Sequence, residues 1–466
     1  MKRIAIIGGG ISGLSAAYFL TKAGHACTLI ERQERLGGVI RSEEVDGCLV
    51  EAGPDSFISE KPWAMELIRE LGLADAVIGS NDHLRKTYVL RRGRLVALPD
   101  GVQFMVPTKI MPLVGTRLLS LGAKAKMGLE WFRRPRGEQP DRSVAEFVTD
   151  HYGAEVNEYL AQPMLAGVYG GEPENLSVNS VLPRFVELEK KHGSLTKGVL
   201  QSRLAAARKG SSNPARKAGS SLFLSLKGGM QQLTDALFGE IETRLTVIRG
   251  DAETVARSAA GFALRANGGT VEADEVVIAT PAYEAGRIVG SLEPKMAELL
   301  AGIGYSSSIT VALLYHRPPF DHPLNGFGIL APRAEGRPIA ACTWVNTKFP
   351  FRAADDRALL RGFFAGAKAE AAMSRGDSEI ASEVHRELQT LMGFRGEPAA
   401  YRVHRWRRAM AQYEVGHQKR LAEIEARLAG APGLHLAGSG YTGIGIPDCI
   451  RRSREIAESI SGGHGS

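Results

Sequence analysis

Residues 1–40 read MKRIAIIGGGISGLSAAYFLTKAGHACTLIERQERLGGVI, and this stretch decides the fold. Short apolar runs predict strands over Arg3–Ile7 and Ala26–Ile30. Between them, Ile11–Ala23 has the length and composition of a helix. A strand, a helix and a second strand in this order form a βαβ unit with parallel strands. The chain is therefore predicted to be an α/β protein.

The turn of this unit carries a glycine pattern that predicts a dinucleotide site. Gly8, Gly10 and Gly13 have the G-x-G-x-x-G spacing. This spacing allows a tight turn, close approach of a pyrophosphate and close packing of the helix on the strand. The pyrophosphate would lie at the N-terminus of the helix, beside Ile11 and Ser12, where unpaired N–H groups attract anions. The alternative is a structural turn that binds nothing.

The residues after the second strand favour FAD over NAD. Glu31 lies at the tip of that strand, where a carboxylate can accept hydrogen bonds from the ribose hydroxyls. Arg32, Arg35, Gly37 and Gly38 follow it. We expect this stretch to bring a second backbone turn and a guanidinium to the same pyrophosphate, which an NAD site does not require.

Three later segments are expected to complete the cofactor site. They are a Gly-Pro bend after a strand, a small-residue turn after a buried strand and a glycine loop before the last helix. Their residues are Gly53, Pro54, Asp55, Ser56, Ala279, Thr280, Gly438, Gly443, Gly445 and Ile446. The sheet is thus predicted to contain strands from both ends of the chain, in a Rossmann-like FAD-binding domain.

The chain is predicted to fold into three discontinuous domains. The FAD-binding domain comprises residues 1–85, 222–290 and 425–466. Strands expected over 309–315, 326–330, 339–345 and 359–365 predict an α+β antiparallel substrate domain, made of residues 86–107 and 291–424. Residues 108–221 form a helical basic domain, for which contact with a membrane is left open. Within it, residues 200–220 are expected to be a loop or linker.

Composition limits the partners and the compartment. The 466 residues carry a net charge of +7, concentrated at 109–142 (net +5) and 184–220 (net +7). This favours an anionic substrate or lipid headgroup; a solvated charged face is the alternative, and no nucleic-acid motif accompanies the charge. Four cysteines without metal or disulfide spacing fit a reducing compartment. We expect no signal peptide, no spanning helix and no metal site, and a cytoplasmic protein whose attachment to the inner membrane face is left open.

The motifs resemble those of the flavin amine-oxidase-like superfamily, and within it the oxygen-dependent protoporphyrinogen oxidase family. The superfamily match rests on residues 8–31, 35–38, 279–281 and 438–448. The closer match rests on residues 50–57 (VEAGPDSF), 167–177 (GVYGGEPENLS), 326–332 (GFGILAP) and 443–450 (GIGIPDCI). Together these segments span nearly the whole chain.

The resemblance implies an FAD-dependent oxidase of haem biosynthesis. Such an enzyme oxidises protoporphyrinogen IX to protoporphyrin IX, with hydride passing to flavin N5 and three O2 reduced to H2O2. Some bacterial relatives oxidise coproporphyrinogen III instead, and this alternative stays open. Family members are monotopic and often homodimeric, and hand-off of the product to a ferrochelatase is a further expectation. No acid–base residue is expected, since neither His151 nor His192 lies in a catalytic pattern.

The resemblance also implies substrate contacts. Phe364 matches an aromatic residue that packs on a pyrrole ring, and Leu330 matches an aliphatic residue on the opposite side; ordinary strand core is the alternative for both. Further apolar or backbone contacts fall at Ile339, Cys342, Ala166 and Gly167.

One position departs from the family pattern. Many members have an arginine that pairs with a substrate propionate where this chain has Thr87. Lys86, Arg85 or Arg91 is expected to replace it, although a lysine lacks the bidentate geometry of a guanidinium. The choice of porphyrinogen is therefore open.

Other functions remain as alternatives. An amine oxidase or a carotenoid desaturase would share the superfamily motifs. A basic pocket repels amines, and desaturases lack the pattern at residues 167–177. A non-catalytic flavin or porphyrin binder is the alternative from another class, which turnover would exclude.

Overall fold

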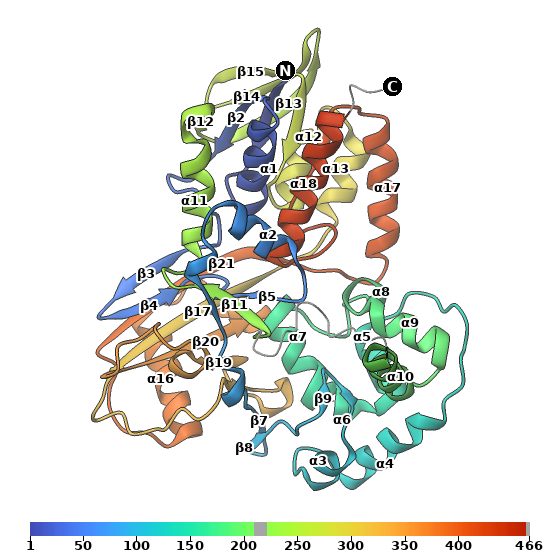
Figure 1. The fold of residues 1–466 in the computed structure, drawn as a ribbon, viewed down its shortest axis with the longest axis vertical. Helices are drawn as coiled ribbons and strands as arrows, with labels where there is room; N and C mark the ends of the chain where they lie inside the picture. The colour runs from blue at the N-terminus through green and yellow to red at the C-terminus, as the bar shows by residue number, and fades with distance from the viewer. Residues whose placement is uncertain (209–220, 463–466) are drawn as a thin grey trace.

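A computed structural model of the chain describes residues 1–208 and 221–462 (Figure 1). Its upper part is built on a parallel sheet of five strands in the order β12-β2-β1-β16-β22. Ile7 of β1 pairs with Ile278 of β16, which pairs with Leu436 of β22. The prediction that both ends of the chain share one sheet is confirmed. The strands span Leu245–Arg249, Ala26–Glu31, Arg3–Ile7, Glu275–Ile278 and Leu434–Leu436.

Each face of this sheet is covered by its own layer. On one face, α1, α2, α11 and α18 enclose a core that includes Ile4, Ile6 and Leu29. On the other, the antiparallel strands β13–β15 and helices α12, α13 and α17 pack on Ala5, Ile7 and neighbouring apolar residues. These elements span Ile11–Lys22 (α1), Trp63–Glu70 (α2), Gln231–Ile241 (α11), Ile446–Gly462 (α18), Ala252–Ser258, Gly261–Ala266 and Gly269–Ala273 (β13–β15), Ala282–Val289 (α12), Pro294–Ala301 (α13) and His417–Ala429 (α17).

Helices α13 and α17 pack into this core, although α13 and most of α17 fall within the range predicted for the substrate domain. Met296 and Leu300 of α13 and Ile424 of α17 lie in the buried cluster against the five-stranded sheet. Burial of their apolar faces, worth about 1.5–3 kcal/mol for each fully buried side chain, ties them to the cofactor side. In the structure, the substrate sheet therefore begins after residue 303, and α17 packs with the C-terminal segment.

A second sheet of seven strands lies at the lower left (Figure 1). Its order is β21-β17-β20-β19-β18-β7-β8, antiparallel except for the β18–β7 pair. The strands predicted at 309–315, 326–330, 339–345 and 359–365 are present, whereas β21 was not predicted. The strands span Ala400–Ala411 (β21), Tyr305–His316 (β17), Arg357–Ala365 (β20), Ala341–Trp344 (β19), Gly328–Leu330 (β18), Thr87–Arg91 (β7) and Arg94–Ala97 (β8).

The two faces of this sheet serve different purposes. Ile309, Leu360 and Phe364 point into a core closed by α15 (Gly366–Ala372) and α16 (Asp377–Met392). On the opposite face, the Thr310 hydroxyl donates to the Ala52 carbonyl at 2.6 Å. Because side chains alternate along a strand, this second face is the one that looks toward the cofactor domain.

Smaller sheets connect the two large ones. β3 (Ser42–Val45) and β4 (Cys48–Glu51) form a hairpin at Asp46-Gly47. β5 (Phe57–Ile58) and β6 (Val77–Gly79) flank β11 (Phe223–Leu226), and β9 (Val102–Gln103) pairs with β10 (Val106–Pro107).

Residues 110–208 form the predicted helical region at the lower right (Figure 1). Helix α5 begins with a capping box: the Glu146 N–H donates to Ser143 Oγ at 3.1 Å, and the Ser143 N–H donates to Glu146 Oε2 at 2.9 Å. α10 continues to Arg208, so the expected loop at 200–208 is helix; residues 209–220 lie outside the described part. The helices span Ile110–Gly115 (α3), Leu121–Leu129 (α4), Val144–Tyr152 (α5), Ala154–Val156 (α6), Gln162–Tyr169 (α7), Val178–Val181 (α8), Pro183–His192 (α9) and Leu195–Arg208 (α10).

Candidate active site

The first glycine turn has the geometry of an anion site. Gly8 has φ +103°, a conformation that side chains disfavour. A Cβ on Gly13 would lie 1.8 Å from the Gly8 carbonyl oxygen, so only glycine fits where α1 meets the turn. Gly10 is the N-cap of α1, and among the described residues no side chain caps it and no acid lies in the first turn at Ile11 or Ser12. The turn therefore fits a pyrophosphate.

The second glycine pair packs directly on the first. The Gly37 N–H donates to the Gly9 carbonyl at 2.8 Å, and a Cβ on Gly38 (φ +58°) would lie 3.2 Å from Gly10 Cα. The Arg35 guanidinium donates to the Leu36 and Ile40 carbonyls at 2.6 and 2.8 Å and to the Gly38 carbonyl. Burial lowers the pKa of this guanidinium. In this structure Arg35 thus holds the shape of the loop that carries the glycine pair.

Glu31 is placed as predicted, at the end of β2. Its carboxylate accepts the N–H groups of Gly9 at 2.6 Å and Gln33 at 2.8 Å. Each carboxylate oxygen can accept a second hydrogen bond, so ribose hydroxyls still fit there. Arg32 points elsewhere and pairs with Glu284 of α12 at 3.3 Å.

The small-residue turn lies between the first and last glycine loops. The Ala279 N–H donates to the Ile7 carbonyl at 2.8 Å. A Cβ on Gly8 would lie 3.0 Å from the Ala279 carbonyl oxygen, and one on Gly438 would lie 3.7 Å from that of Thr280. The structure therefore brings these distant segments to one edge of the parallel sheet, as the sequence predicts.

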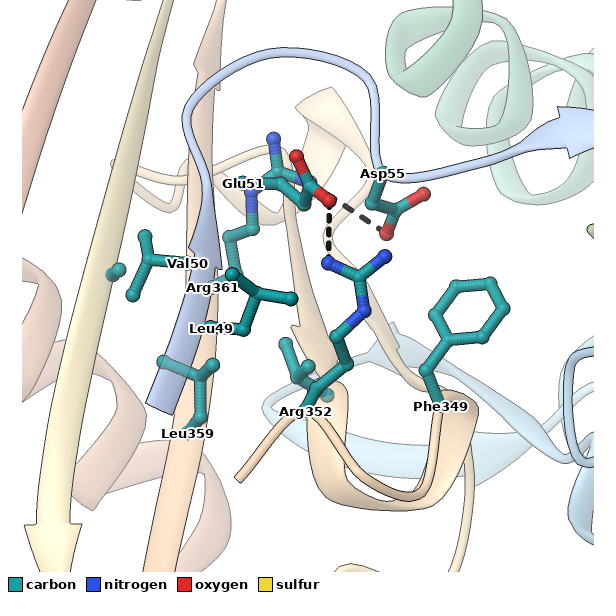
Figure 2. A pocket seen from close by; sticks show the side chains of 10 residues that line it. Leu49, Val50, Glu51, Asp55, Phe349, Arg352, Leu359 and Arg361 are labelled. Carbon is teal, nitrogen blue, oxygen red and sulfur yellow. Dashed lines mark hydrogen bonds and ion pairs between the residues drawn. The ribbon is translucent and has the colours of Figure 1, made fainter. Parts of the chain in front are cut away.

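The Gly-Pro bend joins the cofactor side to the substrate sheet (Figure 2). A Cβ on Gly53 would lie 1.9 Å from the Val39 carbonyl oxygen. Beyond Pro54, both Asp55 oxygens lie 2.9 Å from Lys348 Nζ, and one lies 3.6 Å from Arg361 Nη1. Burial alone would raise the pKa of Asp55, but these two cations hold its pKa well below the usual range.

Asp55 is therefore turned toward substrate-sheet cations rather than toward the glycine loops. The Ser56 hydroxyl donates to the Asp55 carboxylate at 2.6 Å. Glu51 completes the cluster, because it pairs with the buried Arg352 and accepts the Met230 N–H at 2.8 Å. Between the two acids and the two arginines lies a cavity of about 10 Å³, close to the space that one water occupies.

The C-terminal glycine loop leads into α18. Gly438 and Gly443 have φ +124° and +117°. A Cβ on Gly443 would lie 2.5 Å from Asp448 Cγ, and one on Gly445 would lie 3.2 Å from its Oδ2, so the Asp448 side chain lies against this loop. Lys61 Nζ binds the Asp448 carboxylate at 2.6 Å. Ile446 is the first residue of the helix.

Sequence reasoning missed Lys61. Its partner, Asp448, is 387 positions away in the chain. No local pattern links the two residues.

The end of α7 reaches the same loop. Ala166 is buried, whereas Gly167 is exposed and no described atom lies within 4 Å of its Cβ position. Two residues later, the Tyr169 ring contacts the Tyr413 ring edge-on at 6.0 Å. The Tyr413 hydroxyl accepts the Gly443 N–H at 2.8 Å. Gly167 and Tyr169 are two residues apart in α7, so they lie on different sides of the helix. Ala166 and Gly167 are predicted to face the substrate.

The structure separates the other predicted substrate contacts. Leu330 is half-buried against the helical region, on the cofactor-facing side of the sheet. Phe364 is 2% exposed and lies in the opposite core under α16, together with Ile339 and Cys342. Burial raises the pKa of the Cys342 thiol to about 12.

Phe363 takes the cofactor-facing position instead. It is half-buried, and its ring lies 4.8 Å from the Arg361 guanidinium, which donates to the Gly53 carbonyl. Consecutive side chains of a strand lie on opposite faces of the sheet. A difference of one residue therefore separates the core position of Phe364 from the cofactor-facing position of Phe363.

A large basic cavity opens beside the outer strands of this sheet. Its volume is about 1980 Å³, and its walls are the β7–β8 hairpin with the following segment and parts of the helical region. The described residues that line it include eight cationic side chains and three carboxylates. They are Arg85, Lys86, Arg91, Arg92, Arg94, Arg117, Arg184 and Arg203, against Glu60, Asp82 and Asp100. The predicted Lys86 and Arg91 both lie here, with Thr87 between them.

Arg91 is already engaged on one side. Its guanidinium pairs with Glu155 at 2.5 Å and lies 3.9 Å from the centre of the Tyr159 ring. Lys86 is exposed, with its ammonium 5.9 Å from the Tyr88 ring. The cations on the opposite wall, Arg184 and Arg203, were not singled out individually by sequence reasoning.

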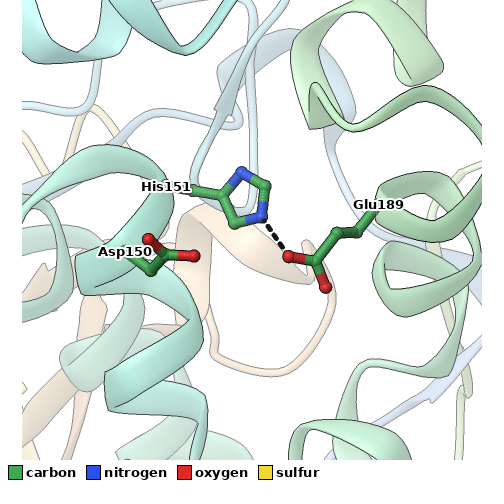
Figure 3. Close-up of side chains that lie close together, drawn as sticks. All are labelled: Asp150, His151 and Glu189. Carbon is green, nitrogen blue, oxygen red and sulfur yellow. Dashed lines mark hydrogen bonds and ion pairs between the residues drawn. The ribbon is translucent and has the colours of Figure 1, made fainter. Parts of the chain in front are cut away.

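The helical region also holds a buried cluster around His151 (Figure 3). Its two ring nitrogens lie 3.1 Å from Glu130 and 3.1 Å from Glu189. Asp150 is close enough to share a cation with His151 and Glu189. However, Arg142 pairs with both Asp150 and Glu189, at 3.4 and 2.6 Å. These contacts describe an ion-pair network that joins α5 to α9.

Within the described part of the chain, none of the helices combines the length and apolar character needed to cross a bilayer.

Comparison with known proteins agrees with the prediction of a flavin-dependent enzyme. A family model described as "Flavin containing amine oxidoreductase" matches residues 11–461. The coproporphyrinogen III oxidase of Bacillus subtilis is 34% identical over 97% of this chain and 96% of its own length. Protoporphyrinogen oxidase 2 of Arabidopsis thaliana is 26% identical over 98% and 94%.

Solved structures agree as well. The crystal structure of a protein assigned as a protoporphyrinogen oxidase from Exiguobacterium sp. 255-15 superposes with a TM-score of 0.86 at 29% identity, covering 99% of this chain and 98% of that one. The chain is a flavoprotein oxidoreductase with FAD as its cofactor. It belongs to the family of flavin-containing amine oxidoreductases.

Proposed function

We propose that the chain oxidises a porphyrinogen to the porphyrin with O2 as electron acceptor, and that its preferred substrate is coproporphyrinogen III. The observation that carries the preference is the basic cavity, whose described walls hold eight cations and three carboxylates. Coproporphyrinogen carries four carboxylates around its ring, whereas protoporphyrinogen carries two on one edge. Cations from both the hairpin and the helical region suit the first pattern better. The relatives named coproporphyrinogen III oxidase support the same choice.

The reaction is three two-electron oxidations. Together they remove six hydrogens, one from each of the four bridge carbons and two from pyrrole nitrogens. Three leave as hydrides from bridge carbons and three as protons, and each electron pair reduces one O2 to H2O2. When bound, FAD accepts the hydride and returns the electrons to O2. The protein contributes binding and orientation: Gly167 leaves backbone open to a flat ring, and Leu330 and Phe363 offer apolar surface on the cofactor-facing side of the sheet.

The missing arginine at Thr87 fits this proposal. Carboxylates on one side of the ring would meet Lys86, Arg92 and Arg94 of the hairpin. Those on the far side would meet Arg184 and Arg203 of the helical region. Binding is then distributed over several cations rather than concentrated in one bidentate clamp.

Steady-state kinetics with coproporphyrinogen III and protoporphyrinogen IX test the proposal. We expect porphyrin fluorescence and peroxide to appear together, with a higher kcat/KM for coproporphyrinogen III. A higher kcat/KM for protoporphyrinogen IX would reverse the preference. Bound porphyrin without peroxide would identify a non-catalytic binder, and turnover of amines alone would identify an amine oxidase.

We further propose that the helical region touches an anionic membrane surface. Helices α3 and α4 lie at the lower end of the molecule in Figure 1. They expose large apolar side chains among cations. Met111 and Leu121 are 78% and 82% exposed. Apolar side chains that insert between headgroups, flanked by lysine and arginine, are typical of interfacial attachment. The exposed residues are Ile110, Met111, Val114, Leu121, Leu129, Trp131 and Phe132, near Lys109, Arg117, Lys124 and Lys126.

Vesicle sedimentation tests this attachment. We expect binding to phosphatidylglycerol vesicles that weakens with salt and is lost in the double variant Met111→Ser with Leu121→Ser. Phe351→Ser removes an apolar side chain that is 80% exposed elsewhere and serves as the control. Equal sedimentation of all three proteins would contradict the proposal.

Homodimer formation and hand-off to a ferrochelatase stay predictions from the family resemblance.

A further inference from the structure

The segment that leaves β21 lies where the cofactor loop, α7 and the substrate sheet meet. Gln412 and Tyr413 are its first two residues, and they are 9% and 2% exposed. Neither belongs to the glycine motifs or to the predicted substrate contacts. Both contact Tyr169 at the end of α7: Gln412 binds its carbonyl, and the Tyr413 ring meets its ring.

Tyr413 contacts both ends of the C-terminal glycine loop, residues 438–446, which we call the cofactor loop. Its hydroxyl donates to the Ser439 carbonyl at 2.8 Å and accepts the Gly443 N–H at 2.8 Å. One hydroxyl can make both bonds, because it carries one donor and two acceptor positions. Gly443 has φ +117°, so the loop is held in a conformation that few residues adopt. Burial raises the pKa of the Tyr413 phenol, which keeps its proton.

The ring of Tyr413 is held in turn by His417, at the start of α17. The two rings stack at 4.3 Å with an interplanar angle of 13°. His417 Nε2 lies 3.1 Å from the Tyr441 carbonyl, which can only accept, so this nitrogen carries the proton. The pair therefore contacts residues 439, 441 and 443, which are alternate positions of one loop.

Gln412 binds the end of α7 through its side-chain amide. Its Nε2 donates to the Tyr169 carbonyl at 2.6 Å and to Ser306 Oγ at 3.0 Å. A Cβ on Gly171 would lie 1.8 Å from Gln412 Oε1, so the chain after α7 passes directly against this amide. The same helix end carries Gly167, two residues before Tyr169.

We propose that Gln412 and Tyr413 are paired positioning residues, Tyr413 for the cofactor loop and Gln412 for the end of the substrate-facing helix α7. Because the two residues are adjacent in the chain, the distance between flavin and substrate is set by one short segment. The part concerning α7 and substrate rests on the proposed function; the part concerning the cofactor loop does not.

Hydrogen–deuterium exchange of the protein freed of FAD tests both halves without turnover. In Tyr413→Phe, which removes only the hydroxyl, exchange of residues 438–446 should rise about tenfold while residues 166–171 stay unchanged. In Gln412→Leu, exchange of residues 166–171 should rise about tenfold while residues 438–446 stay unchanged. Gln412→Met retains the length without the donor and replaces Gln412→Leu if that variant does not fold. Tyr401→Phe, at the exposed start of β21, is the matched control and should change neither segment.

The loaded enzyme gives the second readout. Tyr413→Phe should shift the visible bands and the reduction potential of bound flavin and weaken FAD binding about tenfold. Gln412→Leu should leave the flavin spectrum unchanged and raise KM for porphyrinogen several-fold. If all variants change exchange and spectrum alike, the positioning roles are wrong. If exchange and flavin respond as expected but no porphyrinogen is oxidised, the proposed function fails and the role of Tyr413 stands.

Discussion

The predicted cofactor loops and the basic cavity of this protein are built by different parts of the chain. At the predicted cofactor loops, backbone touches backbone: Gly13 meets the Gly8 carbonyl, and Gly38 meets Gly10. In the cavity, the walls are long side chains such as Arg94, Arg184 and Arg203. A backbone contact fails when any atom is added, whereas a wall of several cations loses binding one charge at a time. The cofactor site should therefore respond abruptly to substitution and the substrate site gradually.

The largest effect is expected at Gly13. In Gly13→Ala the new Cβ would lie 1.8 Å from the Gly8 oxygen, so the turn must open. FAD binding measured by flavin fluorescence should weaken more than a hundredfold, about 3 kcal/mol. Gly239→Ala, in α11 with no described atom near its Cβ position, is the control and should bind FAD normally. Normal binding by Gly13→Ala would refute the view that backbone packing defines this site.

Phe364 and Phe363 test which face of β20 belongs to the site. Phe364→Ala empties a position in the α16 core and should lower the free energy of unfolding by about 3–4 kcal/mol, measured by urea denaturation. Phe363→Ala should cost less stability and raise KM for porphyrinogen. The reverse result would return Phe364 to the substrate slot, where the family resemblance places it.

The cavity should respond more mildly. Replacing Arg184 and Arg203 together by glutamine should raise KM for coproporphyrinogen III about tenfold at low salt, with a smaller ratio at high salt because screening weakens the lost attraction. Lys190→Gln removes an exposed cation that pairs with Glu138 and is the control. A tenfold effect that does not depend on salt would contradict a distributed electrostatic wall.

The smallest expected effect is the dependence of the protein's stability on pH. Burial lowers the pKa of His417, so its neutral form is favoured in the folded protein. The unfolded chain then binds more protons as the pH falls below about 6.5, and stability falls with it. Asp55, whose pKa is lowered, contributes a second loss that begins only near pH 4. Melting temperatures from pH 8 to pH 3 should show both declines.

His417→Gln tests the assignment of the upper decline. His322 and His404, whose pKa values burial also lowers, contribute to the same range, so this variant should reduce the decline rather than abolish it. An unchanged profile would remove His417 from the explanation.

Much of the fold was predictable because its signals are local. The βαβ unit at residues 3–31, the capping box at Ser143 and the β7–β8 hairpin each depend on residues a few positions apart. β21 was missed because its residues alternate arginine with mixed side chains and lack a clear apolar face. Lys61 with Asp448, and Tyr413 with Gly443, pair residues that no spacing rule connects.

The sequence by itself determined the cofactor side of the protein. Any residue larger than glycine at these turn positions would meet backbone, so the glycine spacing alone predicts the loops that bind FAD. Only the tertiary structure decided the substrate side. The sequence does not distinguish Phe363 from Phe364 as a substrate contact. The pairing of β20 with β17 and β19 places Phe363 on the cofactor-facing side of the sheet and Phe364 in the core. Register is a property of the assembled sheet, because every side chain changes face when pairing shifts by one residue.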